Sequence, residues 1–298
     1  MDGKFIDLHV HTDHSDGLDS VYLVMERAKR NNVGIIALTE HYNLSSYREA
    51  KRCAKADIEV IPGIEIGADM SKYGKEKRHI CHILGYFVSN GICTVLDEYE
   101  MNRYECVVET INWLQKRRIN ITLDDVIKNA RDKKSIGRFD VAITLAYLGY
   151  AMTAQEAYGM YLDHKGRSYV KRKKLSPGEL VKKIIEFGGV PVLAHPKSIH
   201  LDTETTKRFI EELTEAGLKG IEVYTPFNND DQRTFYLDLC EKFDLIPTVG
   251  SDYHSLTRKP QVNIGTGINN NLCVTDDSIV KKLKLEKAKL DKQQGKGK

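Results

Sequence analysis

The chain lacks the features that would assign it to a membrane or secreted class. No stretch of its 298 residues approaches the roughly 18 apolar residues that a helix needs to span a bilayer. The first residues, Met-Asp-Gly-Lys, lead directly into a strand-like segment, without the basic, apolar and cleavage-site order of a signal peptide. We therefore expect a cytoplasmic protein without a membrane-spanning helix, and the sequence indicates no obligate protein partner.

Cysteine pairs and a strong net charge are also missing. The six cysteines are scattered, and none belongs to a C-x-x-C pair, so reduced and packed thiols are expected. The net charge is only +3, from 45 basic and 42 acidic residues. Eight of the lysines fall in residues 281–298. We expect residues 276–298 to form a Lys-rich C-terminal tail, a solvated helix for which contact with nucleic acid is the alternative.

What the sequence does contain is an alternation of short apolar runs with helical patterns. Buried apolar strands that alternate with helices indicate a parallel sheet covered by helices, and about seven such units favour a barrel over an open sheet. Strands are expected at 4–8, 34–39, 58–62, 82–87, 189–194, 220–224 and 245–249. Helices are expected at 21–31, where Ser20 is a plausible N-cap, and at 47–56, 204–216 and 230–243.

The alternation stops in the middle of the chain. Helical patterns at 96–117, 123–130, 140–147 and 154–162 follow one another without strand-like runs. We interpret residues 93–185 as a helical insertion that caps the active-site face and the substrate. The catalytic barrel then comprises residues 1–92 and 186–275.

Histidine and acidic side chains gather at the ends of the expected strands. His9 and His11 follow the first strand, and residues two apart in an extended backbone point to the same side, so both imidazoles can reach one metal. Strand ends of a parallel barrel form the face on which sites are built. Other candidates at such ends or in adjoining loops are Asp16, His41, Glu65, His82, His195, Asp252 and His254, with His79 as an alternative to His82.

This grouping predicts a metal centre. One histidine at a strand end is usually a satisfied polar residue, but nine ligand-capable residues at matching ends indicate a shared site. Histidine and carboxylate ligands without thiolate suit zinc, manganese or iron, often as a cluster.

The motifs together resemble those of the polymerase-and-histidinol-phosphatase (PHP) family of metal-dependent phosphoesterases. The matching segments are Asp7-Leu8-His9-Val10-His11-Thr12, Ser15-Asp16-Gly17, Ala37-Leu38-Thr39-Glu40-His41, Pro62-Gly63-Ile64-Glu65, His82-Ile83-Leu84-Gly85-Tyr86, Ala194-His195-Pro196, Gly220-Ile221-Glu222-Val223-Tyr224 and Gly250-Ser251-Asp252-Tyr253-His254. The resemblance implies an α/β fold, a distorted (β/α)7 barrel, with two or three divalent ions.

The resemblance also implies three sets of ligands. The first metal would be held by His9, His11, Glu65 and Asp252. The second would be held by Glu65, His82 and His195, with Glu65 bridging the two ions. The third would be held by Asp16, His41 and His254.

The chain departs from the family at two places. Thr39-Glu40-His41 stands where Thr-Asp-His is usual, and Gly137-Arg138-Phe139-Asp140 stands where the most similar subgroup has Gly-Arg-Pro-His. Arg138 remains a candidate phosphate clamp, because a guanidinium fork matches phosphate oxygens. Asp140 could accept from a sugar hydroxyl or orient Arg138. In the basic run 165–172, Lys165, Arg167 and Tyr169 are candidates for binding a second phosphate.

The main hypothesis is hydrolysis of a small phosphorylated substrate. Bridging metals would generate hydroxide that attacks phosphorus in line, Arg138 would stabilise charge, and His254 or Asp140 would protonate the leaving group. The substrate would be a nucleoside 3′,5′-bisphosphate, a cyclic sugar phosphate or a short oligoribonucleotide. Alternatives are a histidinol-phosphate phosphatase, an amidohydrolase that cleaves a C–N bond, and a non-catalytic nucleic-acid-binding module.

Overall fold

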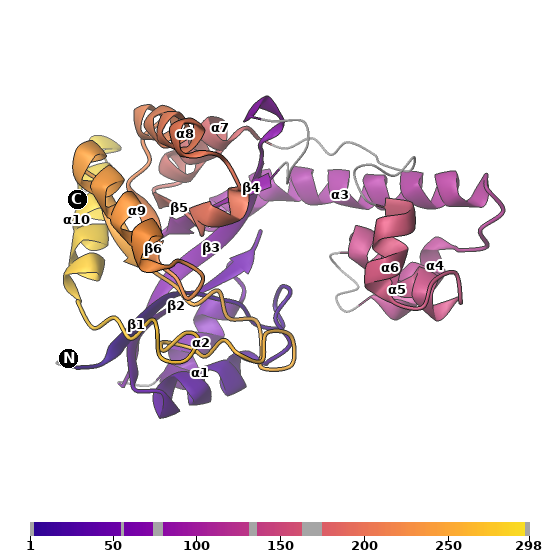
Figure 1. Cartoon of the computed structure of the whole chain (residues 1–298), viewed down its shortest axis with the longest axis horizontal. Coiled ribbons are helices and arrows are strands. Elements are labelled where there is room, and N and C mark those ends of the chain that lie inside the picture. Colours follow the sequence, from indigo (N-terminus) through magenta and orange to yellow (C-terminus); the bar gives the residue numbers. More distant parts are fainter. Residues whose placement is uncertain (1–2, 55–56, 74–79, 131–135, 163–174, 296–298) are drawn as a thin grey trace. The chain divides into compact units, whose positions relative to one another are not determined.

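The chain divides into two compact units. The computed structural model describes residues 3–54, 57–73, 80–130, 136–162 and 175–295 (Figure 1). The first unit, here called the sheet unit, comprises Met1–Cys93 and Leu175–Lys298. The second, the helical unit, is Thr94–Lys174. The basic segment with Lys165, Arg167 and Tyr169 lies outside the described residues, as does His79.

A seven-stranded sheet forms the centre of the sheet unit, with its strands in chain order. The strands are β1 (Phe5–Val10), β2 (Val33–His41), β3 (Glu59–Asp69), β4 (Ile80–Tyr86), β5 (Val190–Leu193), β6 (Gly220–Tyr224) and β7 (Ile246–Val249). Among the described residues no ladder joins β1 to β7; an isolated parallel bridge from Val10 to Tyr253 links the two edges instead. The expected α/β fold is confirmed, with a sheet that is not fully closed.

One strand runs against the expected direction. β4 pairs antiparallel with both β3 and β5, whereas the other neighbouring strands are parallel. The all-parallel prediction was therefore wrong at β4. A parallel pair needs a crossover connection of a dozen or more residues, usually a helix. The ten residues between β3 and β4 are too few for that, and their described part, residues 70–73, contains the 3-10 turn η1 (Ser71–Tyr73).

Helices cover the sheet, and four of them begin with side-chain caps. They are α1 (Val21–Arg30), α2 (Ser46–Ala54), α7 (Pro177–Glu186), α8 (Thr203–Glu215), α9 (Asp230–Phe243) and α10 (Ser278–Gln293), with the 3-10 turn η3 (Pro196–Ile199) (Figure 1). The predicted N-cap Ser20 accepts a hydrogen bond from Leu23 N at 3.3 Å, and Asn229 caps α9 in the same way. These caps fix where the capped helices, α1, α7, α8 and α9, begin.

Two apolar cores lie on the two faces of the sheet. One contains alternate strand residues such as Leu8 and Leu84 together with Leu283 of α10, and the other joins α1 and α2 to residues such as Ile36. The segment expected as a solvated tail is thus largely the helix α10, which buries Ile279, Leu283 and Leu290. That prediction missed the apolar face of α10 because lysines dominate its composition.

The helical unit has its own core. Its elements are the greater part of α3 (Gly91–Gln115), then α4 (Leu123–Asn129), α5 (Arg138–Tyr147), α6 (Ala154–Ala157) and the π-turn η2 (Tyr158–Leu162). Val107, Leu114, Val141 and Leu145 are among its fully buried residues. Residues 94–174 thus form a compact unit, and its role as an insertion that caps the active-site face stays a prediction.

The insertion ends earlier than expected. The second boundary falls at Leu175 instead of 186, because α7 belongs to the sheet unit. Leu180, Val181 and Ile184 are buried on one side of α7, which packs against β4 and β5. In the described ranges no helix is both long and apolar enough to cross a bilayer, and no disulfide joins the six cysteines.

Candidate metal centre

All nine predicted ligands lie at one edge of the sheet. His9 lies in β1, His41 ends β2, His195 follows β5, and Asp252 and His254 follow β7. β3 continues to Asp69, so Glu65 lies inside this strand instead of after it. His82 reaches the same edge from the first half of β4, because β4 is antiparallel. The reversed strand therefore contributes to the cluster from its beginning, whereas the parallel strands contribute from their ends.

The first predicted set is spatially compact. His9 Nε2 and His11 Nε2 lie 3.2 Å apart, and Asp252 Oδ1 lies 3.7 and 3.6 Å from them. Glu65 joins with Oε1 at 3.4 Å from His9 and Oε2 at 3.1 Å from His11. Donor atoms that share one ion at about 2.1 Å in a tetrahedron lie roughly 3.4 Å apart, so the spacings among His9, His11 and Asp252 fit a single ion with Glu65 beside it.

The second set shares Glu65 with the first. His82 Nδ1 lies 2.9 Å and His195 Nε2 lies 3.1 Å from Glu65 Oε1, and the two nitrogens are 3.3 Å apart. Glu65 Oε1 therefore belongs to both sets of donors. This arrangement is the geometry expected of a bridging carboxylate.

The third set centres on Asp16. Its Oδ1 lies 3.2 Å from His254 Nε2, 3.6 Å from His41 Nε2 and 3.6 Å from His11 Nδ1. This oxygen and His41 Nδ1 are buried without a hydrogen-bond partner. Because buried polar atoms are normally satisfied, the unpartnered Asp16 oxygen indicates that a cation belongs among these atoms.

The electrostatics of Glu65 support the same interpretation. Burial alone would raise the pKa of its carboxyl, but the imidazoles of His82, His9 and His41 hold that pKa well below its usual range. Burial and the charge of His254 lower the pKa of His11 to about 3. A charged carboxylate beside a neutral imidazole is the state in which both bind a metal ion. The donor set thus fits divalent metal ions.

Strained backbone presents two of these residues. Asp252 has a φ of 53° and His195 a φ of 25°, in a region that non-glycine residues rarely adopt. Gly250 precedes Asp252, and a Cβ there would lie 2.2 Å from Glu222 Oε1 and 2.3 Å from His9 Cβ. The close approach of β7 to β1 therefore requires glycine, and it brings Asp252 within reach of His9.

Glu222 is a functional residue that the sequence interpretation did not single out. Its Oε1 lies 2.9 Å from His9 Nδ1, and its Oε2 accepts from His195 N at 2.7 Å. Such a partner fixes the ring orientation of an imidazole and leaves Nε2 for the metal. The sequence signal was its place in the matching segment Gly220-Ile221-Glu222-Val223-Tyr224, to which no role was assigned.

Glu40, where the family usually has aspartate, braces the first loop. It accepts hydrogen bonds from the Thr12 hydroxyl at 2.6 Å, from Thr12 N at 3.2 Å and from the Ser15 hydroxyl. Ser15 in turn lies 3.4 Å from His11 Nδ1. The longer carboxylate thus shapes the loop that carries Asp16 without entering the cluster itself.

Two cations after β7 hold the acidic members of the cluster. Lys259 Nζ donates to Asp252 Oδ2 at 2.6 Å, and Arg258 Nη1 donates to Asp16 Oδ2 at 2.9 Å. In each carboxylate the other oxygen, Oδ1, faces the imidazoles. The sequence interpretation missed both cations, because they lie four or more residues past the last motif.

The remaining candidates lie in the helical unit. Asp140 Oδ2 accepts from Gly137 N at 2.7 Å at the start of α5, and Arg138 Nη1 lies 3.5 Å from Leu162 O. Asp140 therefore has a structural contact within its own helix. Roles of Arg138 and Asp140 with a substrate stay predictions.

Comparison with known proteins agrees with this geometry. A 5′-3′ exoribonuclease of Haemophilus influenzae is 27% identical over 255 residues, which cover 84% of this chain and 90% of that protein. A phosphoribosyl 1,2-cyclic phosphate 1,2-diphosphodiesterase of Eggerthella lenta is 26% identical over 264 residues, 83% of this chain and 93% of that one.

A solved structure shares the fold. It is described as an amidohydrolase from Chromobacterium violaceum with bound sulfate and no metal, and it superposes with a TM-score of 0.71 at 25% identity. The match covers 87% of this chain and 89% of that one. The profile of the PHP domain matches residues 7–242, which include seven of the nine cluster residues. The chain therefore belongs to the PHP domain family.

Proposed function

We propose that this chain hydrolyses phosphoester bonds of small phosphorylated substrates with divalent metal ions. The observation that carries the proposal is the position of Glu65, whose two oxygens lie within 3.4 Å of nitrogens from His9, His11, His41, His82 and His195. A carboxylate shared in this way fits adjacent ions. Relatives of similar length that cleave RNA or a cyclic sugar phosphate support phosphorus as the reacting atom.

The proposed ligands follow from the distances in the cluster. Two or three ions of manganese, iron or zinc would be held by His9, His11, Asp16, His41, Glu65, His82, His195, Asp252 and His254. When bound, such ions lower the pKa of water and neutralise charge on phosphate oxygens. The chain itself supplies orientation: Glu222 holds the rings of His9 and the backbone of His195.

His254 suits a ligand role better than that of a general acid. Its Nδ1 lies 2.9 Å from the backbone oxygen of Asp252, so this nitrogen carries the proton. Nε2 then presents a lone pair towards Asp16 Oδ1, as a metal ligand does. Proton donation to the leaving group would fall to Asp140 of the helical unit or to solvent.

The substrate class we favour is a nucleotide, either a nucleoside 3′,5′-bisphosphate or a short oligoribonucleotide, with a cyclic sugar phosphate as the second candidate. Arg138, Lys165, Arg167 and Tyr169 are proposed to bind its phosphates, because guanidinium and ammonium groups pair with phosphate oxygens. Amidohydrolase chemistry is disfavoured, because Glu65 occupies the bridging position where such enzymes usually need a carbamylated lysine.

The test is an assay of purified full-length protein, loaded separately with manganese, iron or zinc, against phosphomonoesters, phosphodiesters and amides. We expect phosphate release that disappears in a His9→Ala, His11→Ala double variant, with bound metal counted by mass spectrometry. Release of ammonia or amine without phosphate would instead assign the chain to the amidohydrolases.

A further inference from the structure

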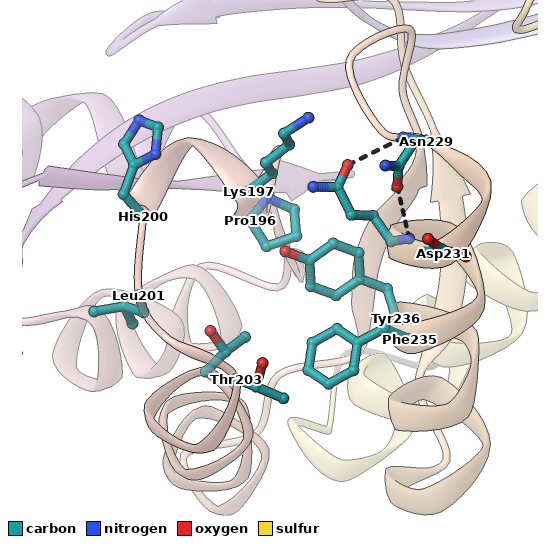
Figure 2. Close-up of a pocket in the computed structure, with 11 residues that line it drawn as sticks. Pro196, Lys197, His200, Leu201, Thr203, Asn229, Asp231, Phe235 and Tyr236 are labelled. Atoms are coloured by element: carbon teal, nitrogen blue, oxygen red, sulfur yellow. Dashed lines mark hydrogen bonds between the residues drawn. The ribbon is translucent and has the colours of Figure 1, made fainter.

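A pocket of about 670 Å³ opens in the sheet unit between η3, the start of α8 and the start of α9 (Figure 2). Its walls come from the loop after β5 and from α9, which follows β6. The carboxyl ends of these strands lie at the edge that carries the candidate metal centre. No residue of the metal cluster lines the pocket, so it is a separate site beside that centre.

Short contacts connect the pocket with the cluster. Pro196, in the pocket wall, follows His195 directly in the chain. Lys197, also in the wall, donates to Phe227 O at 2.7 Å. On the other side, Lys259 Nζ lies 5.6 Å from the centroid of the Phe227 ring while it holds Asp252. Two ammonium groups and one partly exposed ring thus lie between the cluster and the pocket.

The wall contains a tyrosine whose ring is buried and whose hydroxyl faces the pocket. Tyr236 is 6% exposed, and no hydrogen bond joins its hydroxyl to any residue that the structure describes. Figure 2 shows this hydroxyl directed away from α9, towards the side of Pro196. Burial raises the pKa of Tyr236 to about 12, so the group stays protonated. Because it lines the pocket without a partner in the described part of the protein, this hydroxyl is available to donate a hydrogen bond to a bound ligand.

The other walls offer amides and apolar surfaces. Asn229 Oδ1 and Gln232 Oε1 each accept from the other residue's backbone N at 3.0 Å, which leaves both NH₂ groups as donors. Leu201 and the Phe235 ring lie on opposite sides of the pocket (Figure 2). Amide donors and a hydroxyl between apolar walls match a flat heterocycle with polar edges better than a phosphate group.

Charge locates the phosphate outside this pocket. Asp231 contributes a carboxylate to the wall near the start of α9, which disfavours an anion there. Of the two ammonium groups near Phe227, that of Lys259 holds Asp252 of the metal cluster, and that of Lys197 donates to Phe227 O from the pocket wall. A substrate with one phosphate at the cluster and a second, linking phosphate beside these lysines would bring its next nucleoside to the pocket.

We infer that this pocket is a nucleoside subsite that holds a base and ribose of a substrate longer than a mononucleotide. The inference rests on the proposed phosphoesterase function and narrows its substrate class to nucleotides with a second nucleoside. In the bound state Tyr236 and Gln232 donate hydrogen bonds to the nucleoside, and Phe235 and Leu201 contact its ring.

The first experiment is a fluorescence titration of full-length, metal-loaded protein with 2-aminopurine riboside. Tyr236→Phe removes only the hydroxyl, and Gln232→Ala removes one amide. Loss of a single hydrogen bond should weaken binding about three- to tenfold. Thr234→Ala, at an exposed position of α9 outside the pocket, is the matched control and should bind as the unaltered protein does.

The second experiment compares two substrates. Tyr236→Phe and Gln232→Ala should raise the KM for a 5′-phosphorylated dinucleotide three- to tenfold with kcat retained, and leave the KM for p-nitrophenyl phosphate unchanged. Equal increases for both substrates, or no change in KM and in riboside binding, would overturn the inference. If neither substrate is cleaved, the proposed function fails, and the riboside titration alone still decides: binding that both variants weaken supports the subsite, and no binding refutes it.

Discussion

The sheet unit and the helical unit use their ionisable residues in opposite ways. In the sheet unit, Glu65 is 1% exposed and is surrounded by imidazoles that also contact one another. In the helical unit, Asp140 and Arg138 contact backbone atoms of their own unit. Burying so many ionisable groups together is costly unless something offsets it. The comparison teaches that the cluster is built for cations, whereas the helical residues also serve local structure.

The largest expected effect tests the centre of the cluster. Glu65→Gln keeps the size of the side chain but removes the charge that the imidazoles and the proposed ions share. We expect metal content to fall and the rate of phosphate release to drop on the order of a thousandfold. Glu204→Gln, on the exposed surface of α8, is the control. Full metal occupancy in Glu65→Gln would show that Glu65 does not bridge the ions.

Two core substitutions test whether the units are independent. Leu283→Ala in α10 and Leu145→Ala in α5 each remove a fully buried side chain and should cost about 2–5 kcal/mol in the unit concerned. The single tryptophan, Trp113, lies in the helical unit, so its fluorescence in urea follows that unit, whereas metal release follows the sheet unit. If each variant shifted the Trp113 fluorescence transition and the metal-release transition together, the two units would not be independent.

Removing the cation behind Asp252 should have a smaller effect. Lys259→Ala leaves all nine proposed ligands in place but frees Asp252 Oδ2. Partners that orient a ligand typically contribute 10- to 100-fold to metal affinity, and we expect a loss in that range. A chelator competition measures it, with Lys207→Ala on the exposed side of α8 as the control. Unchanged metal affinity would show that Lys259 does not position Asp252 as a metal ligand.

Metal affinity should also rise with pH. Burial would lower the pKa of His9, but the carboxylates of Glu222 and Glu65 outweigh it and raise that pKa well above its usual value. The metal-free ring therefore carries a proton at neutral pH that binding must displace, so affinity increases by up to about tenfold per pH unit. Glu222→Gln removes one of the charges that raise the pKa of His9. Metal affinity should then depend less steeply on pH. An equally steep slope in that variant would contradict this account.

The smallest effect concerns the start of α5. Asp140→Ala removes the acceptor for Gly137 N and should cost about 1 kcal/mol of stability in the helical unit, read from Trp113 fluorescence. Metal content should not change. A large loss of kcat without loss of stability would instead assign Asp140 to the reaction.

Periodicity predicted most of the fold, because each element had to bury an apolar face. The predicted bounds of β6 and α9 agree with the structure, and Ser20 was recognised as an N-cap because serine is a preferred residue there. The direction of β4 could not be read from its apolar pattern, which is the same in either direction. The boundary at Leu175 was missed because α7 is a helix like those of the insertion, and only its packing distinguishes it.

The candidate site was predictable to the extent that ligands occur as short motifs. His9 and His11 are two apart, and Asp252 and His254 repeat that spacing. Glu222 lies in a matching segment, but its contacts with His9 and His195 come from another strand, and Arg258 and Lys259 lie outside every motif. Their identification needed the three-dimensional pairing of the strands.

The reversal of β4 also bears on how the chain assembles. β3 and β4 are near neighbours in sequence, whereas the next pairing joins Ile83 to Leu193 across the whole insertion. Non-local pairings of this kind are slow, because the chain must close a long loop before it gains contacts. If the helical unit collapses first, the loop left to close is effectively much shorter. We therefore expect the helical unit to set the folding rate of the sheet unit, even where it adds nothing to that unit's equilibrium stability.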